Sequence, residues 1–506
     1  MAIVNVVTKW AAGGLLTLVL FGPSAVTAEA KPDTQPQARH EVYPVPPGGT
    51  FTFHGRGYGH GHGMSQWGAY GAAKVAHLSA NQILHFYYPH TKLATKSTKR
   101  EIRVLLTAAN APGRGYVEVK PADGLAVTPV GGGDTALLRT KTKKGHRIKA
   151  WRLRRDGADV DVQERFGGRW HTVDQVAGGA TFTDTDGLIR VFLPGRKVRF
   201  RGALTGEIEN GVMEAVNTVN LEAYLQGVVP AEMPASWSPA ALQAQAVAAR
   251  TYATRGRANP KAAWFDVYGD TRDQAYGGFA SEVTQTTKAI QHTAGEVIVD
   301  HAGHAILAQY SSANGGWTLS GGVNYLPSQH DPYDGLVPND AHAWTTTVTA
   351  GRLESAYPSV GTLREIVVSE RDGNGLWGGR VAAVSLTGSG GTVQLSGTAL
   401  QLALGLRSPW FRPTPVPAAP SALQATATGR TVTAKWKPPD SVRGAARVTG
   451  YRFRLTPGRH KKLLAASTRT VSVDKLPRGT YTVRVVALSS AGAGPPATVV
   501  VKTAHK

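Results

Sequence analysis

The chain of 506 residues has no cysteine and only four methionines. The absence of cysteine excludes a disulfide framework and any thiolate-ligated metal site, so stability must come from packing. Beyond the N-terminal region, no run of 18 apolar residues occurs, which argues against a membrane-spanning helix.

The N-terminus has the pattern of a secretory signal peptide. A lysine precedes a short apolar run, residues 10–21, and small residues suited to cleavage follow at Ala28 and Ala30. We therefore predict a signal peptide over residues 1–30 and a linker over residues 31–49. The protein is expected to be secreted, extracellular or associated with a cell wall; an uncleaved N-terminal anchor is the alternative.

Basic residues exceed acidic ones and are unevenly distributed. Of the net charge of +22, most lies in residues 413–506, where sixteen lysines and arginines accompany two acids. On an exported protein such a surface indicates anionic partners, such as teichoic acids, acidic wall glycans or phospholipid headgroups. Nucleic acid is the general alternative, but no zinc-finger, basic-zipper or ribonucleoprotein motif is present, so no nucleic-acid partner is predicted.

The C-terminal region alternates apolar and polar residues in short runs. After a proline-rich linker, residues 413–420, this period of two predicts antiparallel strands in an all-β, immunoglobulin-like sandwich over residues 421–506. Its pattern resembles a fibronectin type III module. The residues that carry this resemblance are Trp436, Tyr451, Leu476, Tyr481 and the closing run 492–496. A wall-binding role for this region is predicted from its positive charge alone. The alternative is a spacer that binds no ligand.

One glutamate, Glu232, lies between two predicted helices. Ser238 and Pro239 predict a helix that starts near residue 239, with the serine hydroxyl as its cap. A shorter helix over Leu221–Val229 is expected to end before Pro230. An apolar wall would raise the pKa of Glu232 and let it donate a proton near neutral pH. The residues predicted to form that wall are Met233, Pro234 and Trp237; a solvated loop acid is the alternative.

A segment rich in histidine and glycine occupies residues 55–76. Three imidazoles, His54, His60 and His62, suggest a metal site, but alternating glycines favour a tight backbone that a ligand approaches closely. Hydrogen bonds to sugar hydroxyls, structural hydrogen bonds and metal binding all stay open, and no metal is predicted. The side chains considered for sugar binding are His60, His62, Ser65 and Gln66.

A strand-rich region separates this segment from Glu232. Residues 100–107 and 195–206 are predicted as strands. Residues 136–155 are predicted as a basic hairpin or loop with a solvated face, with contact to a wall polymer as the weaker alternative.

Several segments together resemble the SpoIID/LytB family of peptidoglycan lytic transglycosylases. They are residues 209–220, 221–253, 266–278, 309–318, 324–335 and 384–411. The resemblance implies an α+β domain of mixed strands and a few helices over residues 50–412, with core motifs at 209–411. The segment 55–91 resembles the family's GHG motif but comes first, as in a circular permutation. Residues 55–76 should then pack beside the piece that ends near Phe411.

The resemblance implies cleavage of peptidoglycan glycan strands between N-acetylmuramic acid and N-acetylglucosamine, with 1,6-anhydro products. Glu232 would serve as the single general acid and base, with no cofactor. Arg250 is expected to pair with an acid or contact glycan, with Asp270, Asp273, Asp331 and Asp334 as candidate acids. The remaining candidate substrate-binding residues are Ser311, Ser312, Gly315, Gly316 and Asp331. The alternatives are a non-catalytic enhancer of a cell-wall amidase and a glycan-binding wall protein.

Overall fold

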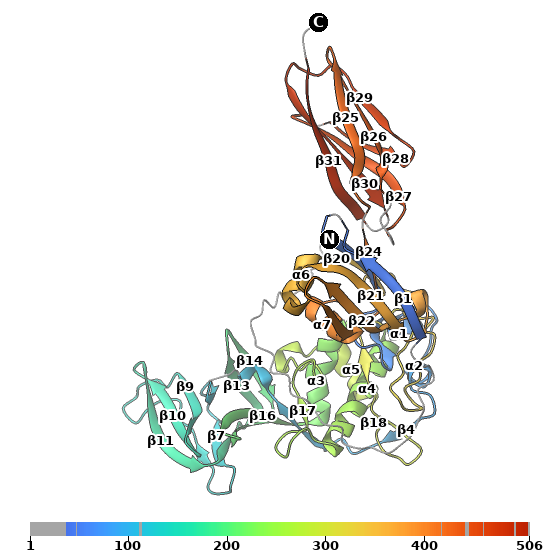
Figure 1. Ribbon diagram of the computed structural model, residues 1–506. Helices are drawn as coiled ribbons and strands as arrows, with labels where there is room; N and C mark the ends of the chain where they lie inside the picture. Colours follow the sequence, from blue (N-terminus) through green and yellow to red (C-terminus); the bar gives the residue numbers. More distant parts are fainter. Residues whose placement is uncertain are drawn as a thin grey trace. The chain divides into compact units, whose positions relative to one another are not determined.

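The computed structural model describes residues 37–46, 48–110, 114–415, 417–440, 445–458, 460–489 and 492–503 (Figure 1). The predicted signal peptide, residues 1–30, lies outside these residues. The fold is α+β, as predicted, with helices and mixed sheets followed by an all-β C-terminal sandwich. No helix in the described part of the chain is long and apolar enough to cross a membrane.

A group of packed helices forms the centre of the first part of the fold. The predicted helix start near residue 239 is confirmed, because α4 (Pro239–Ala258) begins there and buries an alanine stripe. The Ser238 side chain, however, makes no capping hydrogen bond, which corrects the expected cap. The other helices of this group are α1 (Gln66–Lys74), α2 (Ala80–Tyr87), α3 (Leu221–Glu232) and α5 (Thr284–His292).

Helix α3 continues through Pro230 to Glu232, which corrects the predicted end at Val229. Only the last turn lies beyond the proline, so its missing N–H removes a single helical bond. The N–H of Met233 donates to the carbonyl of Val229 at 2.9 Å and closes that turn. Val228 and Val229 are fully buried, so packing overrides the local preference against helix before proline.

The segment near residue 55 lies beside the segment near residue 411, as the permuted order predicted. Strand β2 (Thr50–Arg56) pairs with both β20 (Ala343–Thr349) and β24 (Phe411–Pro415), and Gly55 lies opposite Phe411. Phe53 packs against Phe411 with ring centroids 5.5 Å apart. The short strand β3 (Met64–Ser65) pairs in parallel with β19 (Tyr310–Ser311) and leads directly into α1.

A four-stranded sheet corrects part of the predicted linker 31–49. Residues Gln37–Pro44 form β1, which pairs with β21 because Tyr43 is buried and Glu41 forms an ion pair with Arg371. This sheet has the order β1-β21-β22-β23, with α6 and α7 packed against it. The bounds are β21 (Leu363–Arg371), β22 (Val381–Gly388), β23 (Thr392–Ser396), α6 (Ala350–Ala356) and α7 (Gly397–Leu404).

Two further sheets share one apolar core and hold most of the strands between residues 101 and 220. The six-stranded sheet has the order β11-β10-β9-β6-β13-β14 and the seven-stranded sheet the order β17-β5-β16-β15-β12-β7-β8. The first contains β6 (Tyr116–Val119), β9 (Ala150–Asp156), β10 (Asp159–Phe166), β11 (Arg169–Ala177), β13 (Leu188–Leu193) and β14 (Arg196–Arg201). The second contains β5 (Glu101–Leu105), β7 (Ala126–Pro129), β8 (Ala136–Leu137), β12 (Gly179–Thr183), β15 (Ala203–Glu209), β16 (Val212–Asn220) and β17 (Val267–Tyr268).

These strands confirm the predictions at 100–107 and 195–206, whereas the basic stretch 136–155 divides between the two sheets. A separate two-stranded antiparallel sheet is formed by β4 (Lys92–Thr95) and β18 (Glu296–Val299).

The C-terminal sandwich is confirmed. Its two sheets have the orders β25-β26-β29 and β28-β27-β30-β31, and their core contains Trp436, Tyr451, Leu476 and Tyr481. Strands β24 and β25 extend to Pro415 and from Pro420, so the predicted linker 413–420 is shorter than expected. The remaining bounds are β25 (Pro420–Thr428), β26 (Thr431–Pro439), β27 (Val448–Thr456), β28 (His460–Ala465), β29 (Thr470–Val473), β30 (Thr480–Ser489) and β31 (Gly492–Lys502).

Candidate active site

Glu232 is the last residue of α3 and its side chain is held from two directions. One carboxylate oxygen accepts a hydrogen bond from the N–H of Ala275 at 2.8 Å, and the other accepts one from the Gln66 amide at 3.2 Å. Burial raises the pKa of Glu232, because desolvation disfavours its charged form more than the two hydrogen bonds favour it. The carboxyl is therefore both fixed in position and biased toward its protonated form.

The groups around Glu232 differ from the predicted apolar wall. Met233 is buried in the helical core, while Pro234 is exposed to solvent. Trp237 lies flat on Tyr70, with ring centroids 4.6 Å apart, and also contacts Trp67. These contacts join the α3–α4 loop to α1, the helix that begins with Gln66.

Buried polar residues that the sequence did not single out lie next to the carboxyl. Gln274 donates to the hydroxyl of Tyr310 at 2.8 Å and accepts from the hydroxyl of Tyr224 at 3.3 Å. Burial, together with the nearby negative charge of Glu232, raises the pKa of both tyrosines. Gln274 and Ala275 lie within residues 266–278, one of the segments that resemble the SpoIID/LytB family, and that resemblance was the sequence signal for this part of the site.

The histidine and glycine segment supplies Gln66, which donates to Glu232. Its imidazoles, His60 and His62, come earlier in the segment. The rings of His60 and His62 stack with centroids 5.2 Å apart, and His62 Nδ1 lies 3.1 Å from the carbonyl oxygen of Leu319. His60 is exposed, whereas His62 is partly buried, and burial lowers the pKa of His62. In the residues that the structure describes, no group of three histidine or acidic side chains could hold a metal ion.

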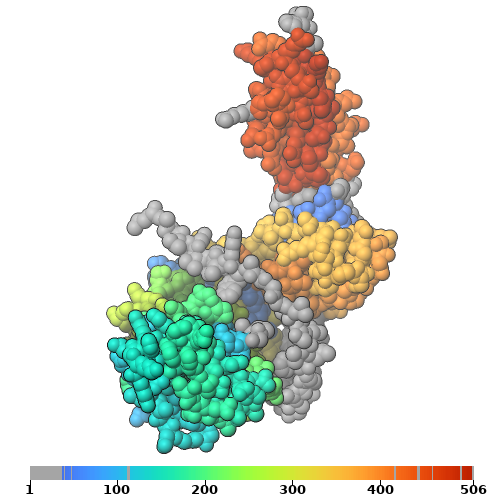
Figure 2. Space-filling view, turned by 90° about the vertical axis from the view of Figure 1, so that its left-hand side faces the viewer, coloured from blue at the N-terminus to red at the C-terminus, as the bar shows by residue number. Residues whose placement is uncertain are grey.

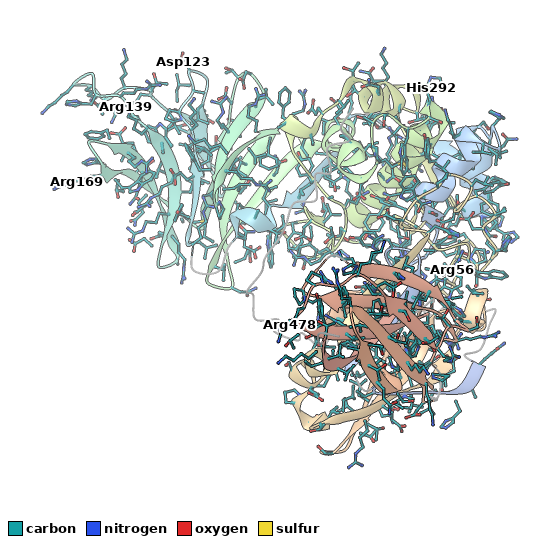
Figure 3. The ribbon with its side chains drawn as sticks, turned by 90° about the horizontal axis from the view of Figure 1, so that it is seen from above. Arg56, Asp123, Arg139, Arg169, His292 and Arg478 are labelled. Carbon is teal, nitrogen blue, oxygen red and sulfur yellow. The ribbon has the colours of Figure 1, made fainter. Side chains whose placement is uncertain are left out.

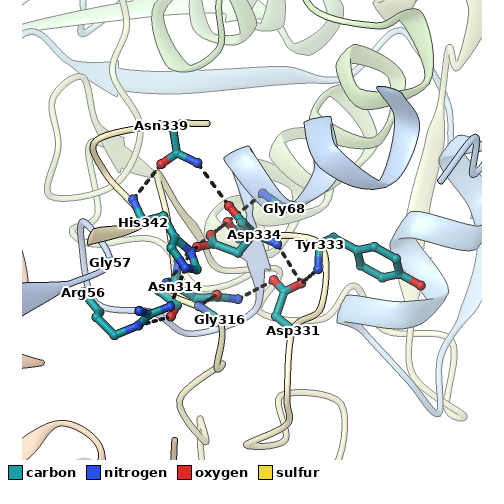
Figure 4. A network of polar contacts seen from close by, with 12 residues as sticks. Arg56, Gly57, Gly68, Asn314, Gly316, Asp331, Tyr333, Asp334, Asn339 and His342 are labelled. Carbon is teal, nitrogen blue, oxygen red and sulfur yellow. Dashed lines mark hydrogen bonds and ion pairs between the residues drawn. The ribbon is translucent and has the colours of Figure 1, made fainter. Parts of the chain in front are cut away.

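Ser65 does not face a ligand, which corrects its prediction as a sugar-binding residue. It is fully buried and caps α1 by accepting from the N–H of Gly68 at 2.9 Å, while its hydroxyl donates to Asp334 (Figure 4). Asp334 also accepts from the N–H groups of Asn314 and Gly315 and lies 2.6 Å from His342 Nδ1. This network joins the histidine and glycine segment to the loop that follows β19.

Asp331 belongs to the same network and is likewise buried rather than available to glycan. It accepts hydrogen bonds from the Tyr87 hydroxyl at 2.7 Å and the Asn314 amide at 2.6 Å. Burial, with the neighbouring charge of Asp334, raises the pKa of Asp331 to about 6. The prediction of Asp331 as a substrate-binding residue is therefore wrong, and its role is to hold this loop.

The group that lies close to the backbone of the paired glycines is another segment of the same chain, near Gly57. Gly315 has φ +77°, and a Cβ there would lie 2.8 Å from the N of Gly57. Gly316 has φ +98° and is partly exposed. Ser311 accepts from the N–H of Gly61 at 3.3 Å and is nearly buried, whereas Ser312 is partly exposed.

Arg250 is a structural residue and not a glycan contact. It is 1% exposed, and both carboxylate oxygens of Glu222 accept from its guanidinium at 2.8 Å. It also donates to the carbonyls of Ile290 and Glu296. Glu222 lies in the first turn of α3, about 15 Å along the helix from Glu232. None of the four predicted aspartates pairs with Arg250; Asp270 binds Arg272, and Asp273 binds Tyr252 and Lys261.

Comparisons with known proteins agree with the motifs. Residues 209–299 match the family model of the stage II sporulation protein, SpoIID, and residues 418–503 match that of the fibronectin type III domain. The first match does not include residues 55–91, so their permuted origin stays a prediction.

Two curated relatives and one solved structure illustrate these matches. The amidase enhancer of Bacillus subtilis is 39% identical over 137 residues, which are 26% of this chain and 18% of that protein. Stage II sporulation protein D of the same organism is 28% identical over 162 residues, covering 28% of this chain and 46% of that protein. The FN5 domain of Drosophila Lar is 26% identical and covers 18% of this chain and 100% of that structure, with a TM-score of 0.16.

The chain thus spans less than half the length of the curated relatives it matches. It carries a SpoIID family domain with the candidate acid Glu232, followed by a fibronectin type III domain.

Proposed function

We propose that this protein acts on the bacterial cell wall as a lytic transglycosylase, with Glu232 as its single general acid and base. The observation that supports this most directly is the fixed, partly buried carboxyl at the end of α3, whose pKa is raised by burial. A protonated carboxyl of this kind can donate a proton near neutral pH.

The proposed reaction has two proton transfers. Glu232 first gives its proton to the oxygen between N-acetylmuramic acid and N-acetylglucosamine, and that glycosidic bond breaks. The resulting carboxylate then removes the proton from the C6 hydroxyl of the same muramic sugar, whose oxygen bonds to C1 and closes a 1,6-anhydro ring. Because the nucleophile belongs to the substrate, no second carboxyl has to activate water.

The neighbours of Glu232 are consistent with this single-acid scheme. Its two hydrogen-bond donors are an amide side chain and a backbone N–H. Asp273, two residues before Ala275, accepts a hydrogen bond from Tyr252 and forms an ion pair with Lys261. Among the predicted substrate-binding residues, four keep exposed surface and are the proposed glycan contacts: His60, His62, Ser312 and Gly316.

The proposal is tested by mass spectrometry of peptidoglycan digests. We expect the purified chain to release fragments with 1,6-anhydromuramic ends, and Glu232→Gln to release none. Glu370→Gln is a matched control, because Glu370 is an exposed acid on β21. Fragments with reducing muramic ends would instead indicate hydrolysis.

A second candidate is a non-catalytic enhancer of a cell-wall amidase, favoured by the 39% identity to the amidase enhancer. Under this alternative the chain alone releases no fragments, and adding it to an amidase increases release of stem peptides. The Glu232→Gln variant would then enhance the amidase as well as the unchanged chain does. Secretion to the cell wall is part of both proposals, as is contact between the basic sandwich and anionic wall polymers.

A further inference from the structure

The outward face of the six-stranded sheet gathers positive charge from neighbouring strands. Residues that alternate with buried Val117, Leu153 and Val191 point to this face. The register places Arg190 opposite Arg199 and Phe192 opposite Lys197. We name this the basic sheet face; it comprises Arg152, Arg154, Arg165, Arg190, Lys197, Arg199 and Arg201.

Aromatic rings order several of these cations. The guanidinium of Arg152 lies 4.0 Å from the ring centroid of Trp170, and that of Arg199 lies 4.3 Å from that of Phe279. The Lys197 ammonium lies 5.0 Å from the ring centroid of Phe192. Such contacts restrain flexible side chains before a ligand arrives, which lowers the entropy lost on binding.

The acids near the basic sheet face are fewer than its cations. Asp161 lies opposite Arg154 and Glu118 lies opposite Arg152 in the sheet. Asp184 and Asp186 line a small hollow together with Arg190 and Arg199. Arg165 lies 4.0 Å from Glu118, and Arg201 pairs with Glu282 at 2.6 Å. In the described part of the chain, five of the cations have no ion pair with a carboxylate. These five are Arg152, Arg154, Arg190, Lys197 and Arg199, and they cross from β9 to β14, about 14 Å at the usual strand spacing.

The seven-stranded sheet, which shares its apolar core with the six-stranded sheet, has an acidic outward side. We call these two sheets together the lobe. The outward hollow of the seven-stranded sheet is lined by Glu207 and Glu209, with Arg103 as the basic residue among threonines. Burial and the nearby charge of Glu209 raise the pKa of Glu207. The two sheets of this lobe therefore differ in charge, and the cations gather on the outward face of the six-stranded sheet. Figure 2 shows part of the surface of this lobe in teal. Arg139 and Arg169, labelled in Figure 3, belong to the same lobe.

We propose that the basic sheet face binds a linear, phosphodiester-linked wall polymer of the poly(alditol phosphate) class. Repeated phosphates match cations that recur across neighbouring strands. Most of the cations are arginines, whose planar guanidinium binds phosphate oxygens in pairs. This surface is distinct from the sandwich and from Glu232, and its binding does not require the proposed glycan cleavage.

The test compares two variants of the full-length chain with equal charge loss. In the first, Arg154, Arg190, Lys197 and Arg199 are all changed to glutamine. In the control, four exposed lysines outside the two sheets and the sandwich are changed to glutamine: Lys74, Lys92, Lys99 and Lys288. Cosedimentation is measured with walls that carry poly(glycerol phosphate), with the same walls stripped of phosphate by hydrofluoric acid, with a polyuronate-bearing wall, and with double-stranded DNA.

We expect the sheet variant to bind the phosphate-bearing walls about tenfold more weakly and the control variant at most about twofold more weakly, as local charge complementarity predicts. Phosphate removal should abolish most binding. Equal losses in both variants, unchanged binding to stripped walls, or tighter binding to polyuronate or DNA would overturn the proposal. If the sheet variant does not fold, the pair Arg154→Gln and Lys197→Gln, both exposed, replaces it. Glu232→Gln should bind as the unchanged chain does, which separates this test from that of the catalytic proposal.

Discussion

Gln66 donates a hydrogen bond to Glu232 across 166 positions of sequence. The donor is the first residue of α1, in the histidine and glycine segment, and the acceptor is the last residue of α3. This contact connects the segment predicted to be permuted with the candidate acid. It also provides a direct way to alter the acid's proton affinity without changing the acid.

Replacing Gln66 with leucine should raise the pKa of Glu232 further, because the amide stabilises the carboxylate form. A higher pKa makes the protonated carboxyl a weaker acid in the first proton transfer, so we expect about a tenfold loss of maximal activity, equivalent to one charge-assisted hydrogen bond of about 1.4 kcal/mol. The measurement is the pH profile of fragment release. The basic limb should move to higher pH, and an unchanged profile with lower activity would indicate a merely structural role.

The ion pair between Glu222 and Arg250 should support the fold and not the chemistry. Arg250→Leu leaves Glu222, whose side chain is 17% exposed, without its main partner. We expect a loss of about 3 kcal/mol in the free energy of unfolding, as for other broken buried pairs. Denaturant unfolding measures this value. The double variant Glu222→Leu with Arg250→Leu should recover part of the loss, whereas a fully stable Arg250→Leu protein with weakened substrate binding would restore the glycan-contact role.

The raised pKa of Asp331 should make stability depend on pH. Its pKa is about 6 in the folded chain against 3.8 as the ordinary value, so the folded state binds a proton that the unfolded state has lost between these values. Stability is therefore greatest below about pH 4 for this group and falls as pH rises to about 6. Denaturant unfolding across this range should show a dependence that Asp331→Asn removes. A variant that keeps the full dependence would assign it to another group.

Gly315 should not tolerate a side chain. Its φ of +77° is unfavourable for other residues, and a Cβ would lie 2.8 Å from the N of Gly57 and 2.9 Å from the backbone of Arg56. Gly315→Ala should therefore lower the melting temperature by several degrees, from about 1–3 kcal/mol of strain. Gly322→Ala is the matched control, since its φ is +75° and nothing lies within 4 Å of its Cβ. Equal effects in both variants would show that the backbone angle alone matters.

The sequence predicted those features that depend on local chemistry or on motif order. Pro239 marked the start of α4, and alternating residues marked the sandwich. The motif order placed the segment near residue 55 beside Phe411. The first two signals are short patterns whose physical consequence does not depend on distant residues, whereas the third comes from the order of motifs in the family that the sequence resembles.

Features set by tertiary contacts were predicted less well. Arg250 was expected to pair with an acid or contact glycan, and it does pair with an acid. That acid is Glu222 and none of the four candidate aspartates, and it lies on a helix whose packing the sequence does not reveal. Ser65 and Asp331 have the polar side chains of a binding site, yet they are buried in a network that joins distant segments. Burial, which separates a ligand-binding polar residue from a structural one, emerges only when those segments pack.

The central claim is that Glu232 alone supplies the proton transfers that cleave the glycan. The most direct measurement is the ratio of 1,6-anhydro to reducing muramic ends, by mass spectrometry, after incubation of glycan strands with and without stem peptides. The account predicts anhydro ends from the unchanged chain and no fragments from the Glu232→Gln variant. Reducing ends as the main product, or full activity in Glu232→Gln, would contradict it.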